Sequence, residues 1–211
     1  MIEELPAMSQ RERNRVRTRN DILDVAAQLL GDVGYSGTTL QEISKLAGVA
    51  RGTVYAYFPA GRDEIVRAVY LRLADEVVQR GNALHAQAEG LEMRIRALAR
   101  ALTEASADPK GRFYGIMGAD LVPVLAGVTG TASRSFENFI RDDLVMALHE
   151  GLLIPGIDIE ALTVALSGAA ARFGQPRGRG PRERRRTDQR PGRPGARFDH
   201  CLNITFRKDL P

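Results

Sequence analysis

The chain has a single cysteine, no tryptophan and no long apolar run among its 211 residues. One cysteine excludes an internal disulfide framework, which fits the reducing environment of the cytoplasm. No apolar run approaches the ~20 residues that cross a bilayer as a helix, and the N-terminus lacks the apolar core of a signal peptide. We therefore expect a cytoplasmic protein with no membrane partner.

Residues that support catalysis or metal binding are also scarce. The three histidines, His85, His149 and His200, are scattered, and none has a Cys or Asp partner at the spacing of a metal site or a catalytic triad. His200 and Cys201 are adjacent, which is not a zinc-ligand spacing. No glycine-rich loop is placed to cradle a phosphate. The sequence thus predicts no enzyme, no metal and no cofactor. The acidic pairs that we expect to be solvated are Asp75-Glu76 and Asp142-Asp143.

Strand-like alternation is missing from the first 171 residues, whereas apolar residues recur at helical spacing. The pattern predicts an all-α fold with a three-helix N-terminal head and a helical body. The first helix is expected to end at Gly34, because glycine commonly follows the last helical residue. Outside the motif described next, helices are expected over 18–33, 63–88, 91–106, 158–172 and, as two helices with a weak junction at 127–130, over 112–151.

Residues 39–58 have the pattern of two short helices joined by a tight turn. Thr39 and Glu42 have capping-box spacing. Gly48 stands where the chain must leave the first of the two helices, and glycine adopts a positive φ without steric cost. Val54 and Phe58 give the second helix an i, i+4 apolar face. The other side of that helix carries a basic residue, hydroxyls and aromatic rings, which suit phosphates and base edges.

This motif resembles the TetR family of transcriptional regulators over roughly residues 15–75. The resemblance rests on Ile43-x-x-x-Ala47-Gly48-Val49-x-x-Gly52-x-x-Tyr55-x-Tyr57-Phe58, preceded by Ile22-Leu-x-x-Ala26-Ala-x-Leu29-Leu-x-x-x-Gly34-Tyr35. There are two departures. Ser44 replaces a common Ala, and Ala50 offers no side-chain cap to the recognition helix, a loss of about 1 kcal/mol.

The resemblance implies which residues meet DNA. Arg51 is the candidate for bidentate reading of a guanine, and Gly52 lets the backbone approach closely. Thr53 and Tyr55 are expected to contact phosphate through their hydroxyls, and Tyr57 either faces the groove or packs in the head. The full set of expected DNA-binding residues is Thr39, Gln41, Arg51, Gly52, Thr53, Tyr55, Tyr57 and Arg62, the last as a phosphate clamp.

Charge is unevenly distributed. Residues 1–60 hold seven basic and seven acidic residues, 61–171 hold 11 and 15, and 172–211 hold 12 and four, so the excess positive charge lies at the end of the chain. In the head, basic residues gather before the first predicted helix, in a segment (1–17) that we expect to be a flexible arm. This arm can neutralise DNA phosphates, or it is simply a solvated, frayed terminus. Its cations and the one just after it are Arg11, Arg13, Arg15, Arg17 and Arg19.

We expect residues 18–62 to form the DNA-binding domain and residues 63–172 to form a regulatory domain for ligand binding and dimerisation. Methionines and aromatics near glycines suit an adaptable apolar cavity, although each of them could equally fill a helical core. By resemblance, a ligand held there changes the separation of two DNA-binding heads. The candidate ligand-binding residues are Met93, Phe113, Tyr114, Met117, Leu121, Phe136, Phe139 and Met146.

Residues 173–211 are rich in Arg, Pro and Gly and have the composition of a disordered cationic tail. In the family that the chain resembles, this region holds the last helix of a homodimer interface, so a homodimer is expected but is in doubt. Two interpretations stay open. The tail is a genuine basic extension, or the reading frame is shifted near residue 172, which is the hypothesis that we favour because shifted GC-rich codons encode Arg, Gly and Pro.

The sequence therefore predicts a regulator that binds double-stranded DNA at a palindromic operator, as a repressor released by a small-molecule effector. Two alternatives remain. One is a regulator with an intact head that has lost its dimer interface and its specific operator binding. The other is a nonspecific cationic protein that binds nucleic acid through its tail.

Overall fold

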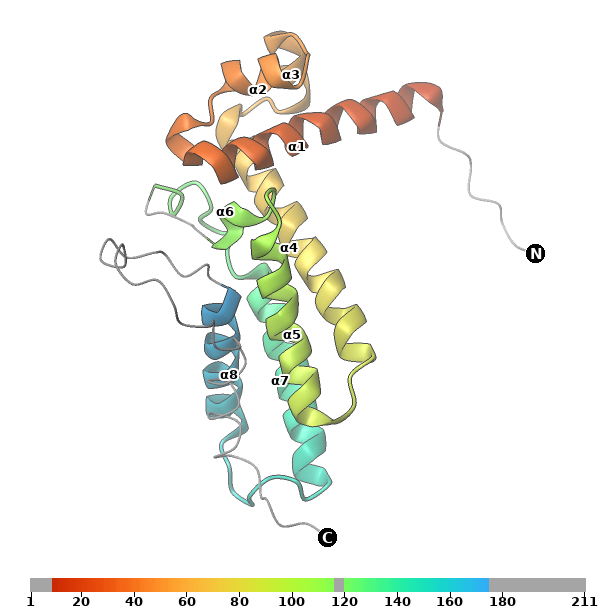
Figure 1. Ribbon diagram of the computed structural model, residues 1–211, viewed down its shortest axis with the longest axis vertical. Helices are drawn as coiled ribbons and strands as arrows, with labels where there is room; N and C mark the ends of the chain where they lie inside the picture. Colours follow the sequence, from red (N-terminus) through yellow and green to blue (C-terminus); the bar gives the residue numbers. More distant parts are fainter. Residues whose placement is uncertain (1–8, 116–119, 175–211) are drawn as a thin grey trace, which may run out of the picture. The chain divides into compact units, whose positions relative to one another are not determined.

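The computed structural model describes residues 9–115 and 120–174, and all regular structure within these residues is helical. The predicted all-α fold is confirmed. These residues form two compact units. The first unit comprises the described residues up to 75 together with 105–129, and the second comprises 76–104 together with those from 130 onward. The helices are α1 (Gln10–Gly37), α2 (Leu40–Leu46), α3 (Arg51–Tyr57), α4 (Arg62–Ala86), α5 (Gly90–Ala107), α6 (Arg112–Gly115), α7 (Thr131–His149) and α8 (Ile159–Gly174) (Figure 1).

The first helix, α1, begins earlier than the sequence predicts. A reciprocal capping box at Ser9 and Glu12 starts it at Gln10, so the flexible arm expected through residue 17 is wrong for residues 10–17. Residues 1–8 lie outside the described part of the chain. At the other end, Gly34 takes φ 73° and breaks the helical path, and a short helical continuation ends at Gly37. The helix therefore kinks at Gly34, where the sequence predicts its end.

The three-helix head packs around apolar side chains from each of its helices. Ile22 and Leu23 of α1, Ile43 of α2 and Val54 of α3 are almost completely buried. Phe58, just after α3, is also buried, so the i, i+4 pair with Val54 is on the inner side of α3, as predicted. Because burying an aliphatic or aromatic side chain contributes about 1.5–3 kcal/mol, these contacts hold two helices of only seven residues that would not persist alone.

The second unit contains the later part of α4, most of α5, and α7 and α8, with α7 and α8 packed side by side (Figure 1). Its core includes Ile95, Leu98, Phe136, Ile140 and Leu144. The ring of Phe136 lies so close to α4 that a Cβ placed on Gly81 would stand 2.6 Å from it. Glycine at that position therefore allows the close approach of α4 and α7.

The helices predicted over 63–88, 91–106 and 158–172 are found with small shifts. Of the two helices predicted over 112–151, the second is present as α7, but the first is wrong beyond the four-residue α6. The described residues 120–130 form turns instead, with Gly127 and Gly130 both at φ 83°. Before α8, the side chain of Asp158 accepts a hydrogen bond from the amide of Ala161, which caps the helix where the sequence predicts its start. Residues 175–211 lie outside the described residues, so both interpretations of the tail stay predictions.

Candidate nucleic-acid interface

The outer side of α3 presents the residues expected to read DNA. Arg51, Gly52 and Tyr55 are exposed, and Thr53 is half-buried. The guanidinium of Arg51 lies 5.9 Å from the centre of the Tyr55 ring, within the range of a cation–π contact. Ala50 provides no side-chain hydrogen bond to the start of the helix, as predicted. The amides of the first turn therefore remain available to an outside acceptor.

The turn that sets the angle between α2 and α3 also follows the prediction. Gly48 has φ 65°, and Val49, the next residue of the turn, is half-buried. The hydroxyl of Thr39 accepts a hydrogen bond from the amide of Glu42 at 3.2 Å, which caps α2. Thr39 and Gln41 are both exposed at the start of α2. This places them where a phosphate could meet the first amides of the helix.

Arg62, at the start of α4, makes contacts inside the first unit. Its guanidinium donates to the hydroxyl of Tyr35 at 2.6 Å and stacks 4.0 Å from the centre of the Tyr35 ring. The Tyr35 hydroxyl in turn donates to Asp63 at 2.7 Å. Burial and the hydrogen bond to Asp63 raise the pKa of Tyr35. Sequence reasoning missed this cluster, because Tyr35 is 27 residues from Arg62.

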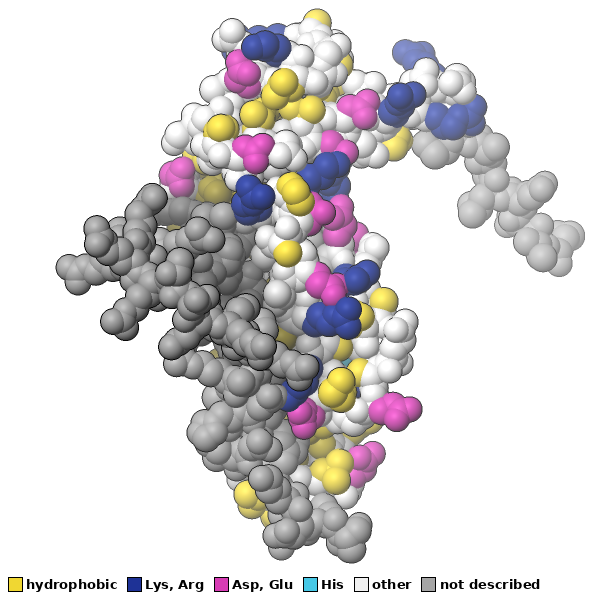
Figure 2. Space-filling view, in the orientation of Figure 1, with side chains coloured by type: hydrophobic (Ala, Val, Ile, Leu, Met, Phe, Trp, Pro, Cys, Tyr) yellow, Lys and Arg dark blue, Asp and Glu magenta, His cyan; other side chains and the backbone are white. Residues whose placement is uncertain are grey.

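A concave surface lies between the N-terminal part of α1 and the end of α3. It has a volume of about 470 Å³ and is lined by Arg11, Asn14, Arg15 and Thr18 of α1 and by Ala56 and Tyr57 of α3. Tyr57 is half-buried here. Figure 2 shows basic side chains gathered along the N-terminal part of α1. We refer to this surface below as the α1–α3 cleft.

The candidate ligand-binding residues do not share one environment. Phe113 and Leu121 of the first unit and Phe136 of the second are buried in their cores, and Phe139 is half-buried with its ring 5.2 Å from that of His85. Met93 and Met146 are exposed, by 53% and 48%. The side chains of Tyr114 and Met117 lie outside the described part.

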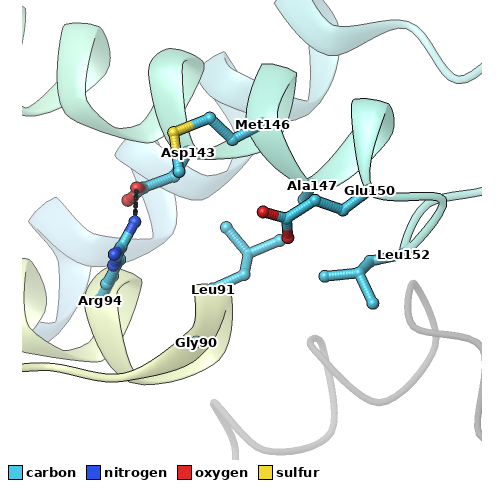
Figure 3. Close-up of a pocket in the computed structure, with 8 residues that line it drawn as sticks. All are labelled: Gly90, Leu91, Arg94, Asp143, Met146, Ala147, Glu150 and Leu152. Carbon is cyan, nitrogen blue, oxygen red and sulfur yellow. Dashed lines mark hydrogen bonds and ion pairs between the residues drawn. The ribbon is translucent and has the colours of Figure 1, made fainter.

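One pocket of about 230 Å³ in the second unit includes Met146 (Figure 3). Figure 3 shows Arg94 of α5 pointing at Asp143 of α7, with Glu150 on the opposite side. The apolar part of the wall comes from Leu91, Ala147 and Leu152. The pocket thus combines charged groups with an apolar wall, as sites for small molecules often do.

Asp143, which lines this pocket, joins three helices. Its side chain is 5% exposed, and its two oxygens lie 2.6 Å from Nε2 of His85 on α4 and 3.0 Å from Nη1 of Arg94 on α5. The expectation that Asp142 and Asp143 are both solvated is therefore wrong for Asp143. The partners are 58 and 49 residues away, and no local spacing in the sequence indicates them.

Within residues 9–115 and 120–174, no group of three or more His, Cys, Asp or Glu side chains is arranged to hold a metal ion. No helix among the residues searched is long and apolar enough to span a bilayer.

Comparisons with known proteins agree with the geometry of the head. The family model described as bacterial regulatory proteins, tetR family, matches residues 22–69. The HTH-type transcriptional regulator AcrR of Shigella flexneri is 54% identical over 41 residues, which are 19% of this chain and 19% of that protein. The chain therefore matches about a fifth of the length of this relative.

Solved structures resemble this chain over most of its length. The fatty acid degradation regulator FadR of Bacillus halodurans has a TM-score of 0.62 at 19% identity, over 74% of this chain and 80% of that one. The ketosteroid transcriptional regulator KstR2 of Mycobacterium tuberculosis has a TM-score of 0.59 at 19% identity, over 90% of this chain and 95% of that one. A TetR-family regulator of Pectobacterium atrosepticum has a TM-score of 0.60 at 22% identity, over 79% of this chain and 83% of that one. Identities this low indicate a shared fold and nothing finer.

Proposed function

Since this chain belongs to the TetR family of bacterial regulatory proteins, we propose that it represses transcription by binding a palindromic operator as a pair of identical chains. A small molecule bound in the second unit would release it from that operator. The observation that carries the proposal is the two-sided character of α3. Its inner side is anchored by Val54 and Phe58, and its outer side exposes Arg51, Gly52 and Tyr55.

The chemistry of this outer side suits the major groove. A guanidinium is the group that most often reads guanine, because its two parallel N–H groups match the O6 and N7 acceptors. Gly52 has no side chain to project from the outer side of α3, and a Cβ added there would meet no protein atom within 4 Å. Tyr55, three residues further along α3, is 41% exposed. A flat centre flanked by donors is what close approach to base edges requires.

Two copies are proposed because one head reaches only a few base pairs. Specific operators are normally read by a two-fold dimer with recognition helices one DNA turn apart. On α8, the exposed residues Ala161, Val164, Ala165 and Gly168 recur at i, i+3, i+4 and i+7. Val164 alone is 65% exposed. A stripe with this spacing supports packing against a second copy of the same helix.

The effector is proposed to bind in the pocket beside Asp143. A ligand shifts an equilibrium only by as much as it prefers one state over the other. Asp143 contacts α4 through His85, and α4 is a single helix that begins at Arg62, close in sequence to α3. A ligand that changes the packing around Asp143 therefore acts on the helix that continues toward the DNA-binding residues.

The test is selection of duplexes from random DNA by the full-length chain, with its solution mass measured by light scattering. We expect an enriched palindrome and a dimer. Arg51→Ala should relax the preference at one base position in each half-site, a loss of about 1–3 kcal/mol in discrimination. The control Lys45→Ala removes an exposed charge from the same head and should leave the sequence preference unchanged. A folded monomer that enriches no sequence would contradict the proposal.

A further inference from the structure

The first three turns of α1 have no core to pack on. From Gln10 to Asp21 every residue is exposed or half-exposed, and the first buried side chain is Ile22. Local contacts hold this extension in place of burial. They are the capping box at Ser9 and hydrogen bonds from Gln10 to Asn14 and from Arg13 to Gln10. At 1.5 Å per residue the extension is about 18 Å long.

The cations of this extension lie on two different sides of the helix. Successive residues are separated by about 100°, so Arg11, Arg15 and Arg19 follow one side and Arg13 and Arg17 share another. The guanidinium of Arg19 lies 5.1 Å from the centre of the Phe58 ring. Only Arg11 and Arg15 line the α1–α3 cleft. The helix therefore aims one pair of guanidiniums at the surface beside α3 and a second pair away from it.

The cleft is built for an anion. Among the described residues, neither Arg11 nor Arg15 has an ion pair or hydrogen bond, and no carboxylate lines the cleft. The remaining polar groups are the hydroxyls of Thr18 and Tyr57 and the amide of Asn14, which is bonded to Gln10. Two unpaired guanidiniums facing one concave surface attract a singly or doubly charged oxyanion, and they bind it through charge-assisted hydrogen bonds.

We propose that the α1–α3 cleft grips a phosphodiester of the DNA backbone beside the groove that α3 reads. This inference rests on the proposed function, because the cleft shares Ala56 and Tyr57 with the recognition helix. A phosphate contact carries no base information, so it should tighten binding to every sequence equally and fix the register of α3 on the operator. Each phosphate neutralised changes the slope of log K against log salt by about 0.9.

The experiment measures the affinity of the full-length chain for its selected operator and for a scrambled duplex of the same length, at a series of salt concentrations. The variant is Arg11→Ala with Arg15→Ala. For this variant, the slope of log K against log salt should become less steep by about 0.9 for each bound head. This corresponds to about eightfold weaker binding per head at 0.1 M salt. Operator and scrambled duplex should weaken by the same factor.

The matched control is Arg13→Ala with Arg17→Ala, which removes the same charge from another side of the same helix. The control loses the hydrogen bond from Arg13 to Gln10, but alanine is the best helix former, so we expect both double variants to keep the extension helical, and circular dichroism checks this. The variant Arg11→Lys with Arg15→Lys keeps the charge and should restore most of the slope. Equal losses in the two alanine variants would overturn the proposal in favour of diffuse electrostatic attraction, and a loss confined to the operator would overturn it in favour of base reading.

These outcomes are separable from those of the proposed function. If selection enriches no sequence, operator binding is wrong, yet the slope measured on scrambled DNA still decides whether the cleft holds a phosphate. If an operator is found and the cleft variant behaves like its control, the cleft inference alone is wrong.

Discussion

The substitution Asp143→Ala removes the buried carboxylate that joins three helices of the second unit. It breaks two charge-assisted contacts, one of 2.6 Å to His85 and one of 3.0 Å to Arg94. Removing one partner of a buried ion pair typically costs 3–5 kcal/mol. Here Arg94 is 33% exposed and lines a pocket, so water can solvate its guanidinium again. We therefore expect the low end of the range, a loss of about 3 kcal/mol in the free energy of unfolding.

Urea denaturation followed by circular dichroism measures this loss directly, and the transition midpoint should fall without a change in slope. For a chain of this size, 3 kcal/mol corresponds to a decrease of about 6–12 °C in Tm. The matched control is Asp142→Ala, one residue earlier on α7, where the side chain is exposed. Its effect should stay within about 0.5 kcal/mol.

A second variant tests whether the loss comes from the contact between Asp143 and His85 rather than from a general defect of α7. Replacing His85 by Ala in the Asp143→Ala background should cost clearly less than it does in the native chain, because the contact is already gone. If Asp143→Ala is no more destabilising than Asp142→Ala, the argument that this carboxylate joins the helices fails.

The remaining predictions concern the first unit. Gly52→Ala should raise stability by up to about 1 kcal/mol, because glycine is a poor helix former and the site has free space, yet it should weaken operator binding in an anisotropy titration. Gly48→Ala should instead destabilise the chain by about 1–2 kcal/mol, because Gly48 has φ 65°. If the two variants shifted Tm by the same amount, the helical role of Gly52 and the turn role of Gly48 would both be contradicted. Burial by itself raises the pKa of Asp24, but its ion pairs with Lys110 and Arg72 lower the pKa overall. The stability from these pairs is present above the ordinary Asp pKa of about 3.9 and is lost as pH falls through the lower folded value, so Asp24→Asn should flatten acid unfolding curves.

The helix-turn-helix was predictable because every signal in it is local. The Thr39 cap, the positive φ at Gly48 and the Val54–Phe58 pair act over one to four residues, and each is present as the sequence predicts. Such features depend on backbone sterics and on the first unpaired amides of a helix, which are set by neighbouring residues. The starts and ends of α4, α5 and α8 were predictable to within a few residues for the same reason.

The start of α1 was mispredicted because burial was used as the signal for a helix. Apolar periodicity begins near Ile22, whereas the helix begins at Gln10 on the strength of a capping box and polar i, i+3 and i, i+4 contacts. Exposed polar helices leave little periodicity in a sequence. The ligand-binding candidates fared differently: residue type identified apolar side chains, but it could not separate the buried Phe136 from the exposed Met93.

By itself, the sequence determined the all-α fold and the helix-turn-helix of the head, because helix periodicity, caps and glycine turns are short-range properties of the chain. Only the tertiary structure decided which charges are paired. It buried Asp143 between His85 and Arg94, joined Arg62 to Tyr35, and placed Arg11 and Arg15 beside Tyr57 with no ion pair to any residue that the structure describes. The sequence does not show which partner a charged side chain will have, because that partner is set by the packing of helices that are dozens of residues apart.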